Sequence, residues 1–315
     1  MDENIKKKIL DIWDKLLEDK DENFLKIYRR INLDQTNANI RVAIRQKDKL
    51  KSIDFVFENI NIKKKNFKNT KGISLEIEDG SILSIYLNKI NFLDVYLNLI
   101  VEIIDSISYE NDEEKVKTVI EEKLNAWKKC FENEDFSGLT KEEELGLIGE
   151  LLTINKLFDL KEYEIEEIIS SWRGPENNLH DFKFADKIYE CKTSLSNIIK
   201  ITNIEQLDFE TYKNLFLFKI TLTKNSHQIN INNLILDLRN NLKDKLIRQL
   251  FNNKINSYGY FDYQAENYKD FYNLLSIHKY KIDENFVTIN KKDLKVGIQN
   301  INFEIDMSYC QKYEK

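Results

Sequence analysis

The stretch that decides the fold of this 315-residue chain is His180-Asp-Phe-Lys-Phe-Ala-Asp-Lys-Ile-Tyr-Glu-Cys-Lys-Thr-Ser194. Charged and apolar residues alternate along it, which predicts a β-hairpin with its turn at Asp186-Lys187. In that register Asp181 lies opposite Lys192. Because successive side chains of a strand point to opposite faces, the charged residues of both strands share one face. These are Asp181, Lys183, Glu190 and Lys192, and the other face carries Phe182, Phe184, Tyr189 and Cys191.

Two carboxylates and a lysine within reach of one another suit hydrolysis at phosphorus. Asp181 and Glu190 supply the oxygen ligands that Mg²⁺ prefers, and Lys192 can orient or deprotonate a water molecule beside the metal. A register slip of one residue would move Asp181 to the face opposite Glu190 and remove this arrangement. Two interpretations remain open: a metal-dependent site, or a solvent-exposed hairpin face with ordinary surface charges.

A second feature is the predicted helix at residues 140–160. It begins with a capping box, Thr140-x-x-Glu143, and has an apolar stripe. The stripe consists of Leu147, Leu151, Ile154 and Phe158. Glu150 falls inside it, where an isolated charge is costly and needs a partner such as a metal or a lysine. Gly146 and Gly149 remove bulk and would let the helix approach the hairpin. The alternative is that Glu150 only borders the core and extends to water.

The order of these features resembles the PD-(D/E)XK nuclease superfamily: a helix with a glutamate, a hairpin with Asp and Glu-x-Lys, a further helix and a strand. More narrowly, the chain looks like a bacterial family of PD-(D/E)XK-motif proteins associated with restriction and phage-defence gene clusters. The segments that carry the resemblance are Gly146-Leu-Ile-Gly149-Glu150-Leu-Leu, Ser171-Trp-Arg-Gly-Pro175, His180-Asp-Phe182, Glu190-Cys-Lys-Thr-Ser194 and Glu205-Gln-Leu207. Together they are far more specific than an Asp and a Glu-x-Lys alone.

The resemblance implies a role for each acidic residue. Glu150, Asp181 and Glu190 would form a metal site, and Lys192 would be the catalytic lysine. The implied cofactor is Mg²⁺, which Mn²⁺ can replace. The implied fold is α/β (α+β), a restriction-endonuclease-like core in which helices flank a mixed sheet. His180 stands where the superfamily has proline before the aspartate, a departure that the narrower family shares.

Three further residues are candidates for substrate or supporting contacts. His180 is either a donor close to the metal or a loop side chain. Arg173, near the chain's single proline, either contacts a phosphate or anchors its loop. Gln206, on a predicted helix after the hairpin, either reaches the site, as a glutamine does in some members of the superfamily, or lies on the surface.

Composition and short motifs exclude several classes of protein and site. The formal net charge is -6 and the isoelectric point about 5.4, so nucleic-acid binding would require a local basic patch. Cys130, Cys191 and Cys310 are far apart, which argues against a disulfide framework or a thiolate zinc site. Motifs for ATP, NAD and zinc-protease sites do not occur. The charged N-terminus and the amphipathic pattern at residues 92–107 predict a cytoplasmic protein without a membrane span.

The chain is predicted to have two domains that meet at the acidic stretch 133–138. Domain 1, residues 1–135, is rich in antiparallel strands and would recognise DNA or a partner protein. Its predicted elements are a helix at 5–17, strands at 40–44, 53–57, 73–77 and 82–87, a turn at Asp79-Gly80, and helices at 92–108 and 112–131. Domain 2, residues 136–315, holds the nuclease-like core. After the hairpin its predicted elements are helices at 203–213 and 233–251, a strand at 215–222, and a small antiparallel addition at 286–289 and 296–305.

These features lead to two hypotheses from different classes. The first is a Mg²⁺-dependent DNA endonuclease with a restriction-like or anti-phage role, working beside a methyltransferase or an ATPase. The second is a catalytically silent scaffold or DNA-binding subunit of a defence complex, which the acidic net charge favours. An RNA substrate would use the same site, and an oligomer is compatible with both hypotheses.

Overall fold

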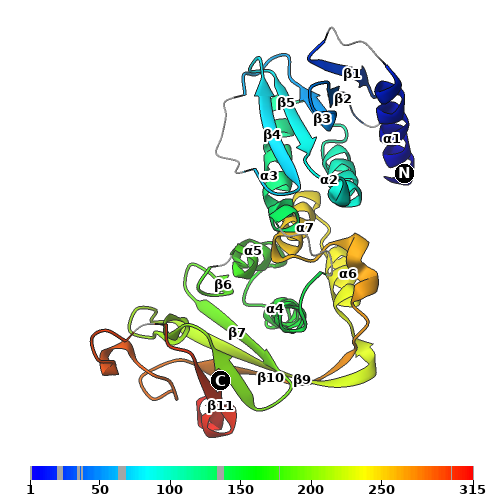
Figure 1. Cartoon of the computed structure of the whole chain (residues 1–315). Coiled ribbons are helices and arrows are strands. Elements are labelled where there is room, and N and C mark those ends of the chain that lie inside the picture. Colours follow the sequence, from blue (N-terminus) through cyan, green and yellow to red (C-terminus); the bar gives the residue numbers. More distant parts are fainter. Residues whose placement is uncertain are drawn as a thin grey trace. The chain divides into compact units, whose positions relative to one another are not determined.

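The computed structural model describes residues 2–19, 24–33, 36, 38–62, 69–132, 138–176, 178–298 and 300–314. The chain divides into two compact units, Met1–Phe136 (unit 1) and Ser137–Lys315 (unit 2), as Figure 1 shows. Residues 133–137 of the predicted domain boundary lie outside the described residues.

Unit 1 is an antiparallel sheet with helices on one face. The five strands are arranged in the order β1-β2-β3-β5-β4. Its elements are α1 (Asp2–Glu18), β1 (Lys26–Arg30), β2 (Asn39–Arg45), β3 (Leu50–Val56), β4 (Ile73–Glu78), β5 (Ile82–Leu87), the 3-10 turn η1 (Ile90–Phe92), α2 (Leu93–Ser106) and α3 (Glu113–Glu132). The predicted helices and strands are confirmed. Strand β1 was not predicted, because its sequence, Lys-Ile-Tyr-Arg-Arg, lacks an apolar alternation.

The turn between β4 and β5 follows from its residue types. Asp79 and Gly80 both have positive φ angles, of 50° and 68°. Two consecutive residues of this kind form the tight turn whose twist matches a β-hairpin, and an Asp-Gly pair tolerates it best. The predicted hairpin turn is confirmed.

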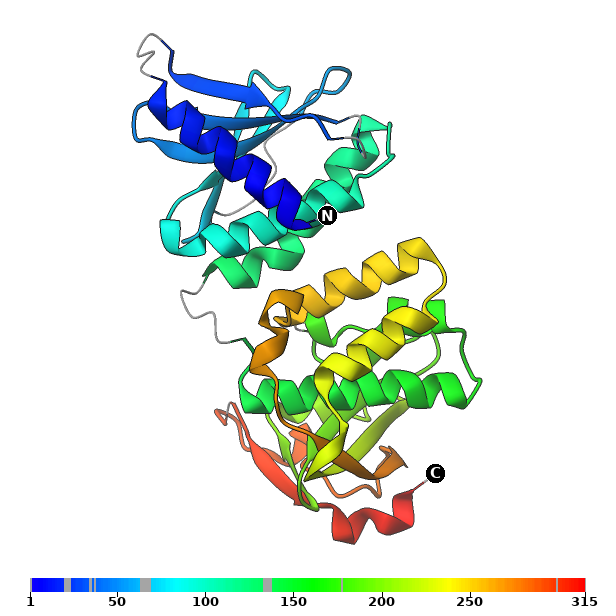
Figure 2. The same cartoon turned by 90° about the vertical axis from the view of Figure 1, so that its right-hand side faces the viewer.

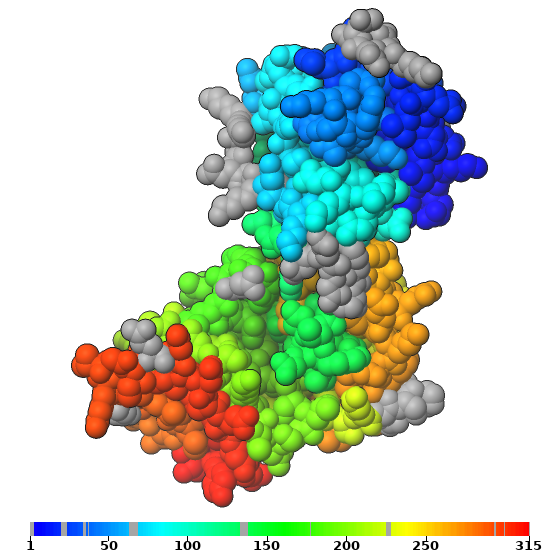
Figure 3. Space-filling view, in the orientation of Figure 1, coloured from blue at the N-terminus to red at the C-terminus, as the bar shows by residue number. Residues whose placement is uncertain are grey.

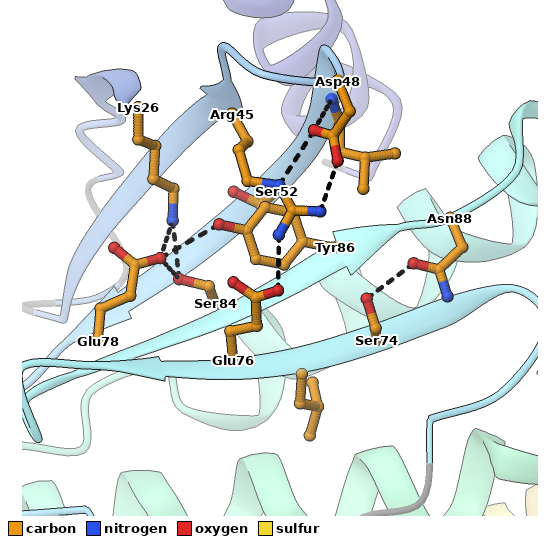
Figure 4. A network of polar contacts seen from close by, with 12 residues as sticks. Lys26, Arg45, Asp48, Ser52, Ser74, Glu76, Glu78, Ser84, Tyr86 and Asn88 are labelled. Atoms are coloured by element: carbon orange, nitrogen blue, oxygen red, sulfur yellow. Dashed lines mark hydrogen bonds and ion pairs between the residues drawn. The ribbon is translucent and has the colours of Figure 1, made fainter. Parts of the chain in front are cut away.

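The two faces of the unit 1 sheet differ in polarity. Ile53 and Phe55 of β3 are buried in the core, and Trp13 of α1 donates a hydrogen bond to Ala43 O (3.1 Å). Asp54 alternates with these apolar residues and projects from the other face, where Lys26 Nζ lies 2.7 Å from its carboxylate. A polar network spreads over this second face (Figure 4). It includes the ion pairs Lys26–Glu78 (2.6 Å) and Arg45–Glu76 (2.6 Å), so both of its cations are paired with carboxylates.

Unit 2 is built on a mixed four-stranded sheet in the order β10-β9-β7-β6. Strands β7 and β9 run parallel, whereas β6 and β10 pair antiparallel with their neighbours. The sheet elements are β6 (Phe182–Lys183), β7 (Ile188–Ser194), β9 (Leu215–Ile229) and β10 (Tyr272–Lys281), and the helices are α4 (Lys141–Asp159), α5 (Ile165–Ser171), α6 (Ile231–Asn241) and α7 (Lys245–Tyr258). A mixed sheet flanked by helices is the predicted α/β (α+β) architecture, which is confirmed.

A second layer lies on the face of this sheet opposite helix α4. Strand β8 (Ile198–Ile201) pairs antiparallel with β11 (Phe303–Asp306), which forms the small antiparallel addition expected at the C-terminus. Short 3-10 turns complete the unit: η2 (Gly174–Glu176), η3 (Ile204–Leu207), η4 (Asp262–Asn267), η5 (Lys291–Asp293) and η6 (Met307–Tyr313). Helix α4 lies on one side of the sheet, and β11 with η6 on the other (Figures 1 and 2). In Figure 3, this C-terminal segment, in red, lies at the surface of the unit.

The two layers have separate cores. Phe218 and Ile220 of β9 pack with Tyr189 of β7 and the helices. Leu215 and Leu217 of β9 pack in the second cluster, with β8, β11 and η6. The β-strand alternation therefore assigns Tyr189 and Cys191 to the helix side of β7, and Glu190 and Lys192 to the other side.

Several predicted elements of unit 2 were wrong in extent. The predicted helix at 203–213 is only η3, and β8 precedes it. The predicted helix at 233–251 is divided into α6 and α7, because Asp244 Oδ1 accepts hydrogen bonds from the amides of Leu246 (2.7 Å) and Ile247 (3.0 Å) and caps a new helix. Strand β10 was missed, since a register shift between Leu274 and Ser276 interrupts its alternation. No strand forms at 286–289, and the predicted strand at 296–305 is reduced to β11.

Candidate active site

The hairpin that carries the candidate site has a different register from the predicted one. Phe182 pairs with Tyr189 and Lys183 with Ile188, and Phe184 N donates to Lys187 O (2.9 Å). The turn is therefore centred on Ala185-Asp186, and the pairing is shifted by two residues. The sequence has no glycine in this turn to set its position, whereas in the folded unit Phe184 stacks on Tyr163 (3.9 Å between ring centroids). A shift of two residues leaves every side chain on its predicted face.

Asp181 is held directly against β7. Its Oδ2 accepts a hydrogen bond from Cys191 N (2.7 Å), which places the carboxylate between Glu190 and Lys192 along the strand. Burial raises the pKa of Asp181, although the nearby Lys192 ammonium and the Cys191 amide oppose that shift. The carboxylate thus lies in a site where a further cation would favour its charged form.

Glu190 and Lys192 form the ion pair at the centre of the site. Their Oε1 and Nζ atoms are 2.7 Å apart, and Glu190 is 1% exposed, so the interpretation as a solvent-exposed charged face is wrong. Burial raises the pKa of Glu190 to about 8, with Asp181 adding to the rise and Lys192 opposing it. Burial alone would lower the pKa of Lys192, but the carboxylates of Glu190 and Asp181 outweigh it and raise that pKa. The lysine is therefore held in its protonated form.

Glu150 is buried on α4 rather than extended to water. Its Oε2 accepts a hydrogen bond from Trp172 Nε1 (2.6 Å), and Tyr258 of α7 also hydrogen-bonds its carboxyl. Burial and then the charge of Asp181 raise the pKa of Glu150 well above its usual range, which links the α4 carboxyl electrostatically to the hairpin. The sequence did not single out Trp172 or Tyr258 as partners of Glu150.

Two glycines leave the space that this arrangement requires. A Cβ at Gly174 would lie 2.0 Å from Glu150 Oε2, and a Cβ at Gly149 would lie 1.6 Å from Thr193 Oγ1. Gly149 therefore allows α4 to approach β7 closely, as the sequence predicts. Gly146 serves another contact, because a Cβ there would lie 2.8 Å from the hydroxyl of Tyr258.

Replacing Gly149 by alanine is expected to lower the free energy of unfolding by about 2–3 kcal/mol, because α4 and β7 must separate to accept the new methyl group. Urea denaturation followed by circular dichroism would measure this loss. Combining Gly149→Ala with Thr193→Ala should restore most of it, since the clash is with the threonine side chain. A double variant as unstable as Gly149→Ala alone would show that the clash is not the cause.

Gln206 of η3 contacts both Lys192 and His180, which lies just before β6. The Gln206 Oε1 atom accepts a hydrogen bond from Lys192 Nζ (3.3 Å), and a second from Thr202 N (3.3 Å). His180 Nε2 lies 3.2 Å from Gln206 O, and its ring stacks edge-on against Tyr212. Burial lowers the pKa of His180. The histidine therefore holds η3, and the glutamine side chain reaches the candidate lysine.

Arg173 anchors the loop between α5 and β6. Its guanidinium NH1 is 3.0 Å from Glu176 Oε2, and its backbone amide donates to Asp181 O (2.6 Å). Glu176 also pairs with the buried Lys254 (3.1 Å). With 42% of its side chain exposed, Arg173 still faces solvent beside these contacts.

Lys219 is a residue near the site that sequence reasoning missed. It is the register partner of Lys192 in the parallel ladder of β7 and β9. A signal for it existed, since Lys219 is the one charged residue in the apolar run Leu215-Phe-Leu-Phe-Lys-Ile-Thr-Leu222. Lysine is seldom fully buried in a central strand unless its charge is paired, so this position is unusual.

The carboxylates fit a divalent cation by their chemistry. Burial raises the pKa of both Asp181 and Glu190, and the Oε2 atom of Glu190 is buried with no hydrogen-bond partner. Hard oxygen donors of this kind suit Mg²⁺. Among the described residues, however, no group of three His, Cys, Asp or Glu side chains is arranged to hold a metal ion as it stands. Ion binding would therefore require side-chain adjustment.

Two other expectations about residue chemistry can be compared with the structure. Cys130, Cys191 and Cys310 are all free cysteines, and Cys191 lies on the apolar side of β7, as the sequence predicts. Within the described ranges, no helix is both long enough and apolar enough to cross a membrane.

Comparison with known proteins gives one match. A family model described as "Putative PD-(D/E)XK family member, (DUF4420)" matches residues 9–308. No curated protein and no solved structure matches the chain. The matched span contains Glu150, Asp181, Glu190 and Lys192.

Proposed function

This chain belongs to the PD-(D/E)XK family that its sequence matches, and from that premise we propose that it is a metal-dependent endonuclease that hydrolyses phosphodiester bonds of DNA. The observation that carries the proposal is the buried Glu190–Lys192 pair beside Asp181. A lysine and two carboxylates that shift one another's pKa values are typical of a catalytic site rather than of a surface.

Asp181 and Glu190 would hold Mg²⁺, or Mn²⁺ in its place, and Glu150 would complete the acidic set. The bound cation would supply a polarised water and neutralise charge on the phosphate. Two raised carboxyl pKa values and a buried oxygen without a hydrogen-bond partner support this assignment. Binding a cation would favour the ionised form of both acids.

Lys192 would orient the attacking water rather than deprotonate it, because its pKa is raised and it stays protonated. Glu190 Oε1 and Gln206 Oε1 both accept from its Nζ and so set its direction. In the reaction, the water oxygen would form a bond to phosphorus and release its proton to solvent, while the bond to the leaving oxygen breaks and that oxygen takes up a proton from solvent. The ammonium also stabilises the negative charge that develops on the phosphate.

The biological setting of this proposal rests on the family resemblance. It is restriction-like or anti-phage cleavage in the cytoplasm, with a methyltransferase or an ATPase as partner. Unit 1 would recognise DNA or the partner protein. Its paired charges support a protein partner at the network of Figure 4 more than a phosphate backbone.

The test is cleavage of unmodified plasmid and phage DNA with Mg²⁺ or Mn²⁺. Wild type should cut, and Asp181→Ala should not, because the substitution removes a metal ligand. Asp186→Ala is the matched control: it removes the same side chain from the exposed hairpin turn and should cut like wild type. Equal cutting by all three proteins would reveal a contaminant, and absence of cutting in all three, with genomic partners present, would contradict the proposal.

Two observations favour a second candidate function, a catalytically silent scaffold or DNA-binding subunit. Lys192 Nζ already occupies Glu190 Oε1 (2.7 Å), and the described residues contain no ready three-ligand metal group. If the protein is a scaffold, Mg²⁺ should not raise its melting temperature. If it is a nuclease, Mg²⁺ should raise the melting temperature of wild type, and Asp181→Ala should abolish that rise.

A further inference from the structure

Lys219 lies on the same sheet face as the proposed catalytic lysine. In the parallel ladder of β7 and β9, its register partner is Lys192. Partners in a ladder project from the same face of a sheet, so both ammonium groups belong to the side of the sheet that carries Glu190. Strand β9 thereby brings a second cation to the edge of the site.

Among the residues that the structure describes, no carboxylate pairs with the buried ammonium of Lys219. The residue is 2% exposed, and its Nζ donates to Ser194 Oγ (2.9 Å), Ser196 O (3.0 Å) and Ile220 O (3.2 Å). All three acceptors are uncharged. Burial lowers the pKa of Lys219 to about 8, the direction expected for a desolvated cation without a nearby carboxylate.

The other buried lysines of the described residues each pair with a carboxylate. Lys123 pairs with Glu102 (2.5 Å), and Lys254 pairs with Glu176 (3.1 Å). A buried charge is costly unless it is paired, and these two lysines follow that rule. Lys219 has no such carboxylate partner among the described residues, and three uncharged oxygens hold its Nζ instead.

The turn that contacts Lys219 is open to solvent, because residues 195–198 are exposed. Ser194 Oγ and Ser196 O accept hydrogen bonds from Lys219 Nζ. Ser196 Oγ accepts from Ile198 N (3.2 Å), so its own O–H can donate to an anion. The Ser194 hydroxyl already donates to Ser196 O (2.6 Å), so this arrangement leaves one hydroxyl donor, that of Ser196, in an exposed turn beside a buried positive charge.

We propose that Lys219 and the turn at residues 194–197 form a phosphate subsite next to Lys192, which binds a backbone phosphate of the nucleic acid. The proposal rests on the proposed nuclease function and specifies how its substrate is held. Lys192 Nζ pairs with Glu190 Oε1 (2.7 Å), whereas Lys219 adds to this face a buried ammonium that no described carboxylate contacts. Lys219 is a positioning residue here, since it acts through the turn and its field rather than on the reacting atoms.

The test is the salt dependence of binding to a fluorescent 20-base-pair DNA duplex, without metal so that no cleavage occurs. Lys219→Gln removes the charge but retains a donor for the turn. It should weaken binding about 5- to 10-fold at low salt and reduce the log–log salt slope by about 1, as loss of one phosphate contact does. Lys224→Met is the matched control on the same strand, because Lys224 is exposed and already pairs with Asp270 (3.8 Å). It should change neither quantity.

If the subsite exists, Lys219→Met should melt no lower than wild type, because it removes a buried charge that no described carboxylate pairs with. If Lys219 has only a structural role, the same variant should melt at a lower temperature. A lower melting temperature with an unchanged salt slope would overturn the subsite, as would wild-type protein that binds no duplex at any salt. Cleavage is scored separately: wild type that binds with the predicted slope but never cuts with metal would contradict the nuclease and leave the subsite standing.

Discussion

Lys192→Met is expected to reduce the rate of metal-dependent DNA cleavage by about 100- to 10,000-fold, the range for loss of a positioned acid–base or charge-stabilising group. Methionine keeps most of the side-chain volume but lacks the ammonium that pairs with Glu190 (2.7 Å) and donates to Gln206 (3.3 Å). The water and the developing phosphate charge then lose their donor. Single-turnover cleavage at saturating enzyme would isolate this step from DNA binding.

The control for this experiment is Lys183→Met, which removes the same group from an exposed position near the turn of the same hairpin. It should cut at the wild-type rate. Circular dichroism should show that both variants fold, because Lys192→Met leaves Glu190 free to take up a proton rather than remain as a buried unpaired charge. Cleavage by Lys192→Met within a few fold of wild type would exclude this lysine from the chemistry.

Glu190→Gln is expected to flatten the dependence of the free energy of unfolding on pH. The folded pKa of Glu190 is raised to about 8 from an ordinary value of 4.5, so the folded state binds its proton more tightly than the unfolded state. Stability contributed by this proton is present below about pH 4.5 and is lost as the pH rises to about 8. Above that pH wild type should carry a penalty on the order of 4 kcal/mol that the glutamine variant lacks.

Urea denaturation at intervals from pH 4.5 to pH 9, without metal, would measure the two curves. Glu166→Gln, at an exposed position in α5, is the control and should follow wild type. Adding Mg²⁺ should restore stability at high pH in wild type but not in Glu190→Gln, since the ion binds the ionised carboxylates. Parallel curves for wild type and Glu190→Gln would mean that Glu190 is not the titrating group.

Local sequence was sufficient for the parts of the molecule that short-range physics decides. The Asp79-Gly80 turn, the capping box of α4 and the alternation of β2 to β5 each depend on neighbours a few residues away. The hairpin faces also follow from alternation, which is why a register error of two residues did not separate Asp181 from Glu190. Helix breaks and bulges depend on weaker signals, and those predictions were wrong.

The sequence by itself determined that a Glu-x-Lys hairpin and a helix with an inward glutamate would lie in one unit, because period and residue type are local properties. Only the tertiary structure decided what surrounds them. The donors of Glu150, the contact of Gln206 with Lys192 and the burial of Lys219 come from residues 14 to more than a hundred positions apart. Such contacts form only when the strands and helices pack, and packing sets the burial that shifts every pKa in the site.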